Sequence, residues 1–244
     1  TVCALVGMIL VVTSATPLPI WMYAIWLTFA VAGVILSNGF AEFQKLKRSV
    51  WASLLIVIVG LVAVEAPYRR APQLIIPPDA TIYVLGDSIS AGISAKDRTW
   101  PEVLQELSGH LVVNCARAGA TVDAAHRQAL EITEPNALVI VEIGGNDLLG
   151  TTTADAYYES LNRLVAGLVD EHQVLLMELP LFPFQNAFGE AQRRVTATHG
   201  VELLPKRYFT RVLALPNSTS DGLHLSQVGH DAMAAMINEL LFAD

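Results

Sequence analysis

The stretch TIYVLGDSIS, residues 81–90, decides the fold of this chain. Apolar and β-branched residues run into Gly-Asp-Ser, after which the sequence turns small and polar. This pattern predicts a buried parallel strand that ends in a tight turn. Ligands of open α/β sheets bind beyond the carboxyl ends of the strands, so Ser88 is expected where chemistry is done. A purely structural turn, in which Asp87 and Ser88 cap backbone groups, fits the same residues.

Apolar runs and helical patterns alternate downstream of this turn. Further strands are predicted at 111–115, 137–143, 173–179 and 201–204, and helices at 99–108, 122–132, 154–170, 187–199 and 227–242. The segment between residues 204 and 227 is expected to be a loop. The first helix carries a capping box, with Thr99 as the N-cap and Glu102 as its partner. Alternating strands and helices predict a parallel sheet with helices on both faces.

Composition divides the 244 residues near Arg70. The first 70 residues are strongly apolar with a net charge of +3, which leaves −11 for the remainder. An acidic remainder argues against a nucleic-acid surface. We therefore expect a membrane region at 1–70, a stiff Pro-rich linker at 71–79 and one catalytic domain at 80–244. Cys3 and Cys115 are the two cysteines, which is too few for a disulfide framework or a Cys-based zinc site.

Two apolar runs in the first region predict membrane-spanning helices. Residues 20–37 contain no charge and carry aromatic residues at one end, and residues 50–66 form a shorter second run. At 1.5 Å per residue the first run reaches about 27 Å, enough to cross a bilayer core, and its aromatic end suits the membrane interface. Residues 2–14 are apolar but short, and we interpret them as the end of a further helix, with a signal-peptide core as the alternative.

The positive-inside rule assigns an orientation to these helices. The connection between them, residues 38–49, carries Lys45, Lys47 and Arg48 against Glu42, which places it in the cytoplasm. The acidic domain then lies on the extracytoplasmic side of the cell membrane. Two arginines at positions 69 and 70 oppose this orientation weakly.

Four predicted loops at the carboxyl edge of the sheet carry residues suited to acyl transfer. Ser88 provides a hydroxyl, Gly119 an unobstructed backbone N–H and Asn146 an amide donor. In the fourth loop, His224 provides a base and Asp221 the group that orients it. Each of these residues also fits a purely structural role, as a turn or cap residue. Separate structural roles do not explain why all the required chemical types occur together at one edge of one sheet.

A second histidine, His230, follows His224 closely, and the sequence pattern alone does not choose firmly between the two as the base. We interpret Asp147 as a structural residue that caps the segment after its own loop.

These motifs resemble the four blocks of the SGNH hydrolases, also called GDSL esterases. The blocks are Gly86-Asp87-Ser88-Ile89-Ser90, Gly119, Gly144-x-Asn146-Asp147 and Asp221-x-x-His224. The similarity spans about residues 81–241 and is greatest to the bacterial thioesterase, lysophospholipase and arylesterase branch. Ile89 stands where the family often has Leu.

The resemblance implies a flavodoxin-like three-layer α/β/α fold with strand order 2-1-3-4-5. It implies that Ser88 is the nucleophile and that His224 is the general base oriented by Asp221. The backbone N–H groups of Ser88 and Gly119 and the side chain of Asn146 are implied to form the oxyanion hole. Asp87 and Asp147 are then structural neighbours of the site, and no metal or organic cofactor is implied.

The expected function is hydrolysis of a small acyl ester, a thioester or a lipid by a membrane-anchored serine esterase. One alternative is an O-acyltransferase or polysaccharide O-acetylesterase of the cell envelope, since some membrane acetyltransferases carry such a domain after their helices. Another is a binding module that keeps the pocket without the chemistry. Neither acyl length nor oligomeric state follows from the sequence.

Overall fold

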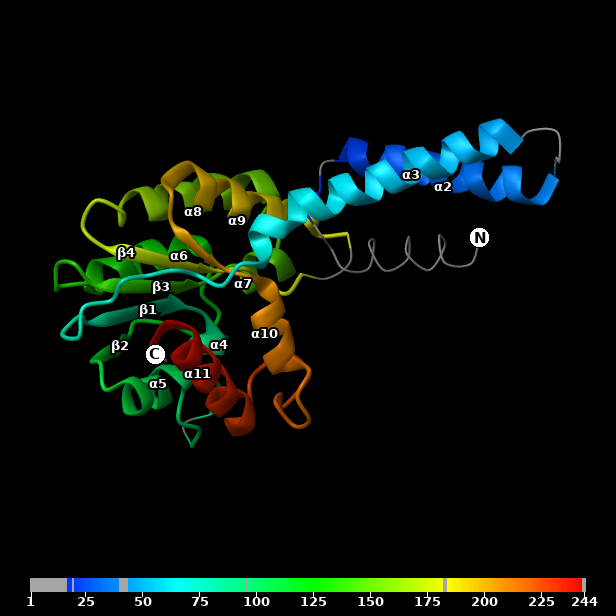
Figure 1. Cartoon of the computed structure of the whole chain (residues 1–244). Coiled ribbons are helices and arrows are strands. Elements are labelled where there is room, and N and C mark those ends of the chain that lie inside the picture. The colour runs from blue at the N-terminus through cyan, green and yellow to red at the C-terminus, as the bar shows by residue number, and fades with distance from the viewer. Residues whose placement is uncertain (1–16, 19, 40–43, 95, 182–183, 243–244) are drawn as a thin grey trace. The chain divides into compact units, whose positions relative to one another are not determined.

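The computed structural model describes residues 17–18, 20–39, 44–94, 96–181 and 184–242. The chain forms two compact units (Figure 1). The first comprises Thr1–Arg70 together with Leu181–Glu190, and the second comprises Ala71–Pro180 and Ala191–Asp244. The sequence predicted that residues 181–190 belong to the catalytic domain, whereas in the structure they cluster with the N-terminal region.

The second unit is built on a five-stranded sheet of order β2-β1-β3-β4-β5. All neighbouring strands are parallel, which confirms the predicted topology. Its strands are β1 (Ile82–Gly86), β2 (Val112–Asn114), β3 (Leu138–Glu142), β4 (Gln173–Met177) and β5 (Glu202–Leu204). Every residue of β1 and β3 is buried, because helices cover both faces. This explains why both strands appear in the sequence as continuous apolar runs.

Helices form the outer two layers of this unit. In Figure 1, α5 and α11 cover one face of the sheet and α6 and α8 cover the other. The helices of the unit are α4 (Ser88–Ala91), α5 (Trp100–Ser108), α6 (Val122–Gln128), η3 (Ala129–Glu131), α7 (Gly145–Leu149), α8 (Ala154–Ala166), α9 (Asn186–His199, whose first turn belongs to the other unit), α10 (Lys206–Leu213) and α11 (Gln227–Phe242). Helix α10 lies in the segment expected to be a loop. Its buried Phe209 and Val212 join the core beside α11, so tertiary packing supports a helix too short to be evident from pattern alone.

The capping box predicted before α5 is present. Glu102 Oε2 accepts a hydrogen bond of 2.7 Å from the backbone N–H of Thr99. The helix ends at Gly109, whose φ of 75° places it in the left-handed region. Between these ends the indole of Trp100 is fully buried in the core. The cap therefore fixes the start of α5 beneath the Ser88 turn.

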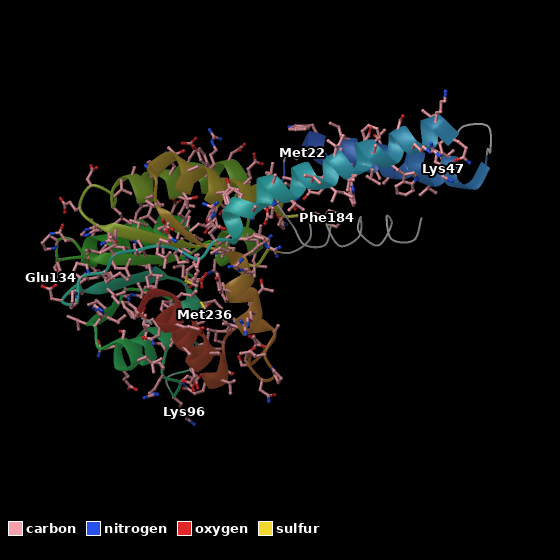
Figure 2. All side chains as sticks on the ribbon, in the orientation of Figure 1. Met22, Lys47, Lys96, Glu134, Phe184 and Met236 are labelled. Carbon is pink, nitrogen blue, oxygen red and sulfur yellow. The ribbon has the colours of Figure 1, made fainter. Side chains whose placement is uncertain are left out.

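The first unit contains two antiparallel helices, α2 (Ile20–Gly39) and α3 (Gln44–Glu65), followed by η2 (Ala66–Arg69). They pack through a small cluster centred on Trp26, Ala30 and Leu54. The ring of Trp51 packs against Gly33, where a Cβ would lie 3.5 Å from the ring. Lys47, labelled in Figure 2, lies in the first turn of α3.

Within the described residues, one helix is long and apolar enough to cross a membrane, namely Gln44–Arg69. The apolar part of α2, Trp21–Leu36, is shorter. Length and composition thus support one of the two expected spans, because 16 residues at 1.5 Å each reach only about 24 Å. The further helix expected at 2–14 lies outside the described residues.

Residues 181–190 belong to the first unit through specific contacts. The Asn186 side-chain amide donates a hydrogen bond of 2.9 Å to the Tyr23 hydroxyl of α2. Gly189 is needed for close packing, because a Cβ there would lie 2.7 Å from Leu181 Cδ1. The segment leaves the catalytic unit shortly after the carboxyl end of β4.

Candidate active site

Ser88 begins α4 immediately after β1, at the carboxyl edge of the sheet. The Asp87 carboxylate caps this turn by accepting a hydrogen bond of 3.0 Å from the backbone N–H of Ile89. Gly86 cannot carry a side chain, since a Cβ would lie 2.8 Å from Ser90 Oγ and 2.9 Å from the carbonyl oxygen of Glu142. The sharp Gly-Asp-Ser turn is therefore a consequence of close packing against β3.

Asn146 joins three of the predicted loops. Its amide nitrogen lies 2.9 Å from the carbonyl oxygen of Ala120 and 3.3 Å from Asp87 Oδ2. The Asn146 loop turns at Gly144, whose φ is 122° and where a Cβ would lie 2.6 Å from the Tyr157 hydroxyl. The first three sequence blocks thus meet at one point of the sheet edge.

Gly119 lies in an exposed turn closed by a hydrogen bond of 3.0 Å from Ala120 N–H to the Arg117 carbonyl. A Cβ at Gly119 would touch nothing within 4 Å. Its φ of 77° is what favours glycine at this position. The turn is tied to the nucleophile loop, because Arg117 N–H donates to the Gly86 carbonyl at 3.1 Å.

Asp147, interpreted from the sequence as a cap of the segment after its own loop, also bonds a segment that precedes it in the chain. Its buried Oδ2 accepts a hydrogen bond of 2.8 Å from Val122 N–H, at the start of α6. The carboxylate therefore holds the helix that follows the Gly119 turn. A contact between residues 25 apart in the chain depends on the fold and could not be found from local sequence.

The fourth loop contains an Asp–His pair. His224 Nδ1 lies 2.7 Å from Asp221 Oδ2, and Asp221 Oδ1 accepts hydrogen bonds from the backbone N–H groups of His224 and Leu223. The hydrogen bond with the His224 ring, and then these two backbone bonds, hold the pKa of Asp221 below its usual range. Asp221 is therefore ionised and leaves Nε2 of the imidazole as the free nitrogen of the pair.

In the nucleophile turn, burial raises the pKa of Asp87, while the hydrogen bond from the Ile89 backbone and then the charge of His224 lower it. The His224 side chain is about a quarter exposed, at 26%. In the described part of the chain, Ser88 Oγ makes no hydrogen bond, and His224 bonds only within its own loop. Catalytic hydrogen bonds are often long in free enzymes and tighten with substrate.

His230, the other histidine that the sequence left open, has a different environment. It is buried at 1% exposure, and its Nδ1 accepts a hydrogen bond of 3.2 Å from Trp100 N–H. Burial lowers its pKa. This histidine supports the packing of α11 on α5, whereas His224 stands beside a carboxylate at the solvent-accessible edge.

Two buried side chains beneath Ser88 were not predicted from the sequence. The Gln128 side chain accepts a hydrogen bond from the Gly86 N–H and donates one to the Gly86 carbonyl, each at 2.9 Å. The Glu142 carboxyl, 1% exposed at the end of β3, accepts a hydrogen bond of 2.8 Å from Ser90 Oγ. Glu142 was visible in the sequence as the one polar residue in the apolar run 137–143.

Burial shifts the acidity of the carboxyl groups beside the turn. It raises the pKa of Asp87 to about 6, and it raises the pKa of Glu142 well above its usual value. The charge of Asp87 raises the pKa of Glu142 further. The two acids are neighbours, so ionisation of one disfavours ionisation of the other.

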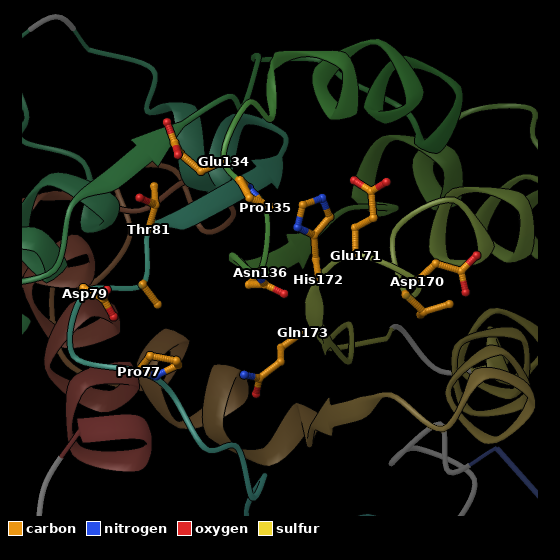
Figure 3. A pocket seen from close by; sticks show the side chains of 12 residues that line it. Pro77, Asp79, Thr81, Glu134, Pro135, Asn136, Asp170, Glu171, His172 and Gln173 are labelled. Atoms are coloured by element: carbon orange, nitrogen blue, oxygen red, sulfur yellow. The ribbon is translucent and has the colours of Figure 1, made fainter.

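A separate cavity of about 740 Å³ lies at the opposite edge of the sheet (Figure 3). It is lined at the start of β1, β3 and β4 by residues that include Asp79, Asn136 and His172. None of the residues expected to be catalytic lines it. Within the described residues, no group of three or more His, Cys, Asp or Glu side chains is placed to hold a metal ion.

The model of the GDSL-like lipase/acylhydrolase family matches residues 84–232, more than half of the chain. The chain belongs to this family. It is a serine hydrolase, and the ester-hydrolase activity predicted from the four motifs is confirmed at the level of the family. No curated protein matches the chain significantly.

Solved structures of the family share its fold. TesA is 26% identical with a TM-score of 0.57, and the match covers 64% of this chain and 95% of TesA. The psychrotrophic esterase EstA from Pseudoalteromonas sp. is 22% identical with a TM-score of 0.58, covering 66% and 96%. The lipase/acylhydrolase from Enterococcus faecalis is 20% identical with a TM-score of 0.52, covering 65% and 93%.

Proposed function

We propose that this serine hydrolase cleaves carboxylic esters or thioesters through an acyl-enzyme on Ser88. Ser88 Oγ attacks the acyl carbon while His224 Nε2 takes its proton, and Asp221 stabilises the imidazolium that forms. His224 then returns the proton to the leaving alcohol or thiol. Water, deprotonated by the same imidazole, attacks the acyl-enzyme; the bond to Ser88 Oγ breaks, His224 returns the proton to Oγ, and the acid is released.

The observations that support this proposal are the meeting of three motif loops at Asn146 and the Asp–His pair of the fourth loop. Asn146 bonds to both the Ser88 turn and the Gly119 turn, and His224 lies against the Asp221 carboxylate. The pair of His224 with Asp221 has the separation required to orient a general base. A binding module has no need of an ionised carboxylate held against an imidazole at the same edge.

The oxyanion is proposed to bind to the backbone N–H groups of Ser88 and Gly119 and to the Asn146 amide. Both hydrogens of that amide have acceptors in the structure, Ala120 and Asp87. Donation to the oxyanion therefore replaces the longer bond, the one of 3.3 Å to Asp87. The amide is thus already held beside the Ser88 and Gly119 turns before charge develops, which is the preorganisation that an oxyanion donor requires.

The N-terminal helices are proposed to anchor the enzyme in the cell membrane with the catalytic domain outside the cytoplasm. Side chains along α3 that do not pack within its unit support this, among them Leu55, Ile56, Val59 and Val62, each more than half exposed. So much apolar surface on one helix is typical of contact with lipid. A reporter that works only outside the cytoplasm should be active when fused after Asp244 and inactive when fused near Lys47.

The substrates proposed are small acyl esters, thioesters or lipids that lie close to the membrane. The test is a panel of aryl esters and thioesters of increasing acyl length, assayed with the detergent-solubilised full chain and its Ser88→Ala variant. Hydrolysis that depends on Ser88 supports the proposal. Acyl transfer to an added sugar acceptor, with little release to water, would instead favour an O-acyltransferase.

A further inference from the structure

A buried carboxyl group holds the backbone on both sides of the nucleophile. The Glu142 carboxyl accepts the hydroxyl of Ser90 at 2.8 Å, two residues after Ser88. It also receives a backbone hydrogen bond from Asp87, the residue before Ser88. These contacts cross from the end of β3 to the turn after β1, two strands whose residues Gly86 and Glu142 are paired in register.

The direction of the hydrogen bonds in this cluster is fixed. Trp100 Nε1 lies 3.1 Å from Ser90 Oγ, and an indole nitrogen can only donate. The Ser90 hydroxyl therefore accepts from Trp100 and must give its own hydrogen to Glu142. All three side chains are at most 1% exposed, so water does not replace a lost partner.

We propose that Glu142 is a positioning residue of this enzyme, which holds the Ser88 turn in its reactive geometry through Ser90 and the backbone of Asp87. The inference rests on Ser88 being the nucleophile, as proposed above. Its physical basis is that a misplacement of about 1 Å at a reacting group costs about 100-fold in rate. The Ser88 turn lies in a four-residue helix, too short to hold its own geometry.

The chemistry of the site specifies which substitutions test this role. Glutamine offers Ser90 a carbonyl acceptor in the same place, and burial raises the pKa of the carboxyl group that it replaces. Leucine fills a similar volume but leaves the Ser90 hydroxyl without an acceptor. Glu142→Gln should therefore keep most of the function that Glu142→Leu loses.

Glu178 provides a matched control. It follows β4 at the same edge of the sheet and is also 1% exposed, but it pairs with Arg193 at 2.7 Å, away from the Ser88 turn. Glu178→Gln alters another buried carboxylate at this edge of the sheet without touching the residues that flank Ser88. Its effect should appear in the melting temperature and not in turnover.

The experiment measures kcat, KM and melting temperature for the full chain and these three variants with one short aryl ester. Glu142→Leu is expected to lower kcat at least tenfold with KM changed less than threefold, while Glu142→Gln stays within about threefold of the parent. Should Glu142→Leu remain folded with an unchanged kcat, or lose kcat only in proportion to lost folded protein, the role is refuted. Ser88→Ala, run alongside, separates the two claims: activity retained there would reject the proposed nucleophile rather than Glu142.

Discussion

Asp221 Oδ2 lies 2.7 Å from Nδ1 of His224, within a loop that also donates two backbone N–H groups to the same carboxylate. The loop thus fixes both the tautomer and the direction of the imidazole. Leu223 and Gly222 allow this arrangement, since the φ of Gly222 is 88°. The base is built by four consecutive residues rather than by distant parts of the fold.

Asp221→Asn should lower kcat by about 10²–10⁴, because the amide can stabilise neither the required tautomer nor the imidazolium. Steady-state kinetics across pH will show this, together with a rate that falls in acid as the His224 imidazole protonates. Asp170→Asn, at an exposed position, is the control. Equal activity in the Asp221 and Asp170 variants would remove Asp221 from the mechanism.

Asn146→Ala should lower kcat by about 10²–10³ with little change in KM, the cost typical of losing one oxyanion donor. Asn162, which lies in α8 and bonds His199 at 2.8 Å, provides the matched control Asn162→Ala. An effect of Asn146→Ala confined to KM would instead identify a substrate-positioning residue.

Stability should depend on pH through Glu142. Its pKa is raised in the folded state, so the folded protein holds a proton that the unfolded chain loses near pH 4.3. Stability from this group is lost as pH rises toward the folded pKa, at about 1.4 kcal/mol per pH unit. Comparing Glu142→Gln with the parent cancels the titrating groups that do not interact with Glu142.

The melting temperature of Glu142→Gln should therefore improve relative to the parent between pH 5 and pH 8. Glu178→Gln should show no such trend, because it breaks an ion pair with Arg193. This substitution should lower the free energy of unfolding by about 3–5 kcal/mol, by a similar amount at each of these pH values. A constant difference between Glu142→Gln and the parent would mean that Glu142 is already ionised in the folded state.

A fragment starting at Ala71 should hydrolyse a short aryl ester, because the residues proposed as catalytic all lie between Ser88 and His224. Its stability should fall below that of the full chain, since the Asn186 amide loses the Tyr23 hydroxyl. Thermal melts and single-turnover kinetics test both statements. A folded fragment that forms the acyl-enzyme but releases acyl only when helices or a sugar acceptor are supplied would favour the acyltransferase.

Local sequence was sufficient for the parts of the fold that depend on pattern. The apolar runs that become β1 and β3, and the Thr99 cap, were predicted because burial and capping leave periodic or short-range signals. The partner of Asp147 and the contact of Asn186 with Tyr23 were not predicted, because they join residues 25 and 163 apart. Such contacts are set by topology and leave no mark on neighbouring residues.

The candidate site shows the same division. The motif residues could be named because few side chains suit acyl transfer, and family resemblance fixed their order. The support beneath them was harder to see, since Gln128 lies in an ordinary helical pattern. Glu142 gave a signal, a carboxylate in an apolar strand, but its partners Ser90 and Trp100 appear only when β1, β3 and α5 are assembled.

The most direct test of Ser88 as the nucleophile is covalent labelling of the folded full chain with a fluorophosphonate, measured by intact-mass and peptide mass spectrometry. One adduct is expected, on Ser88, formed faster at neutral pH than in acid. This adduct should be absent from Ser88→Ala and present in the neighbouring control Ser94→Ala. An adduct on another residue, or esterase activity retained by folded Ser88→Ala, would contradict the assignment of Ser88 as the nucleophile.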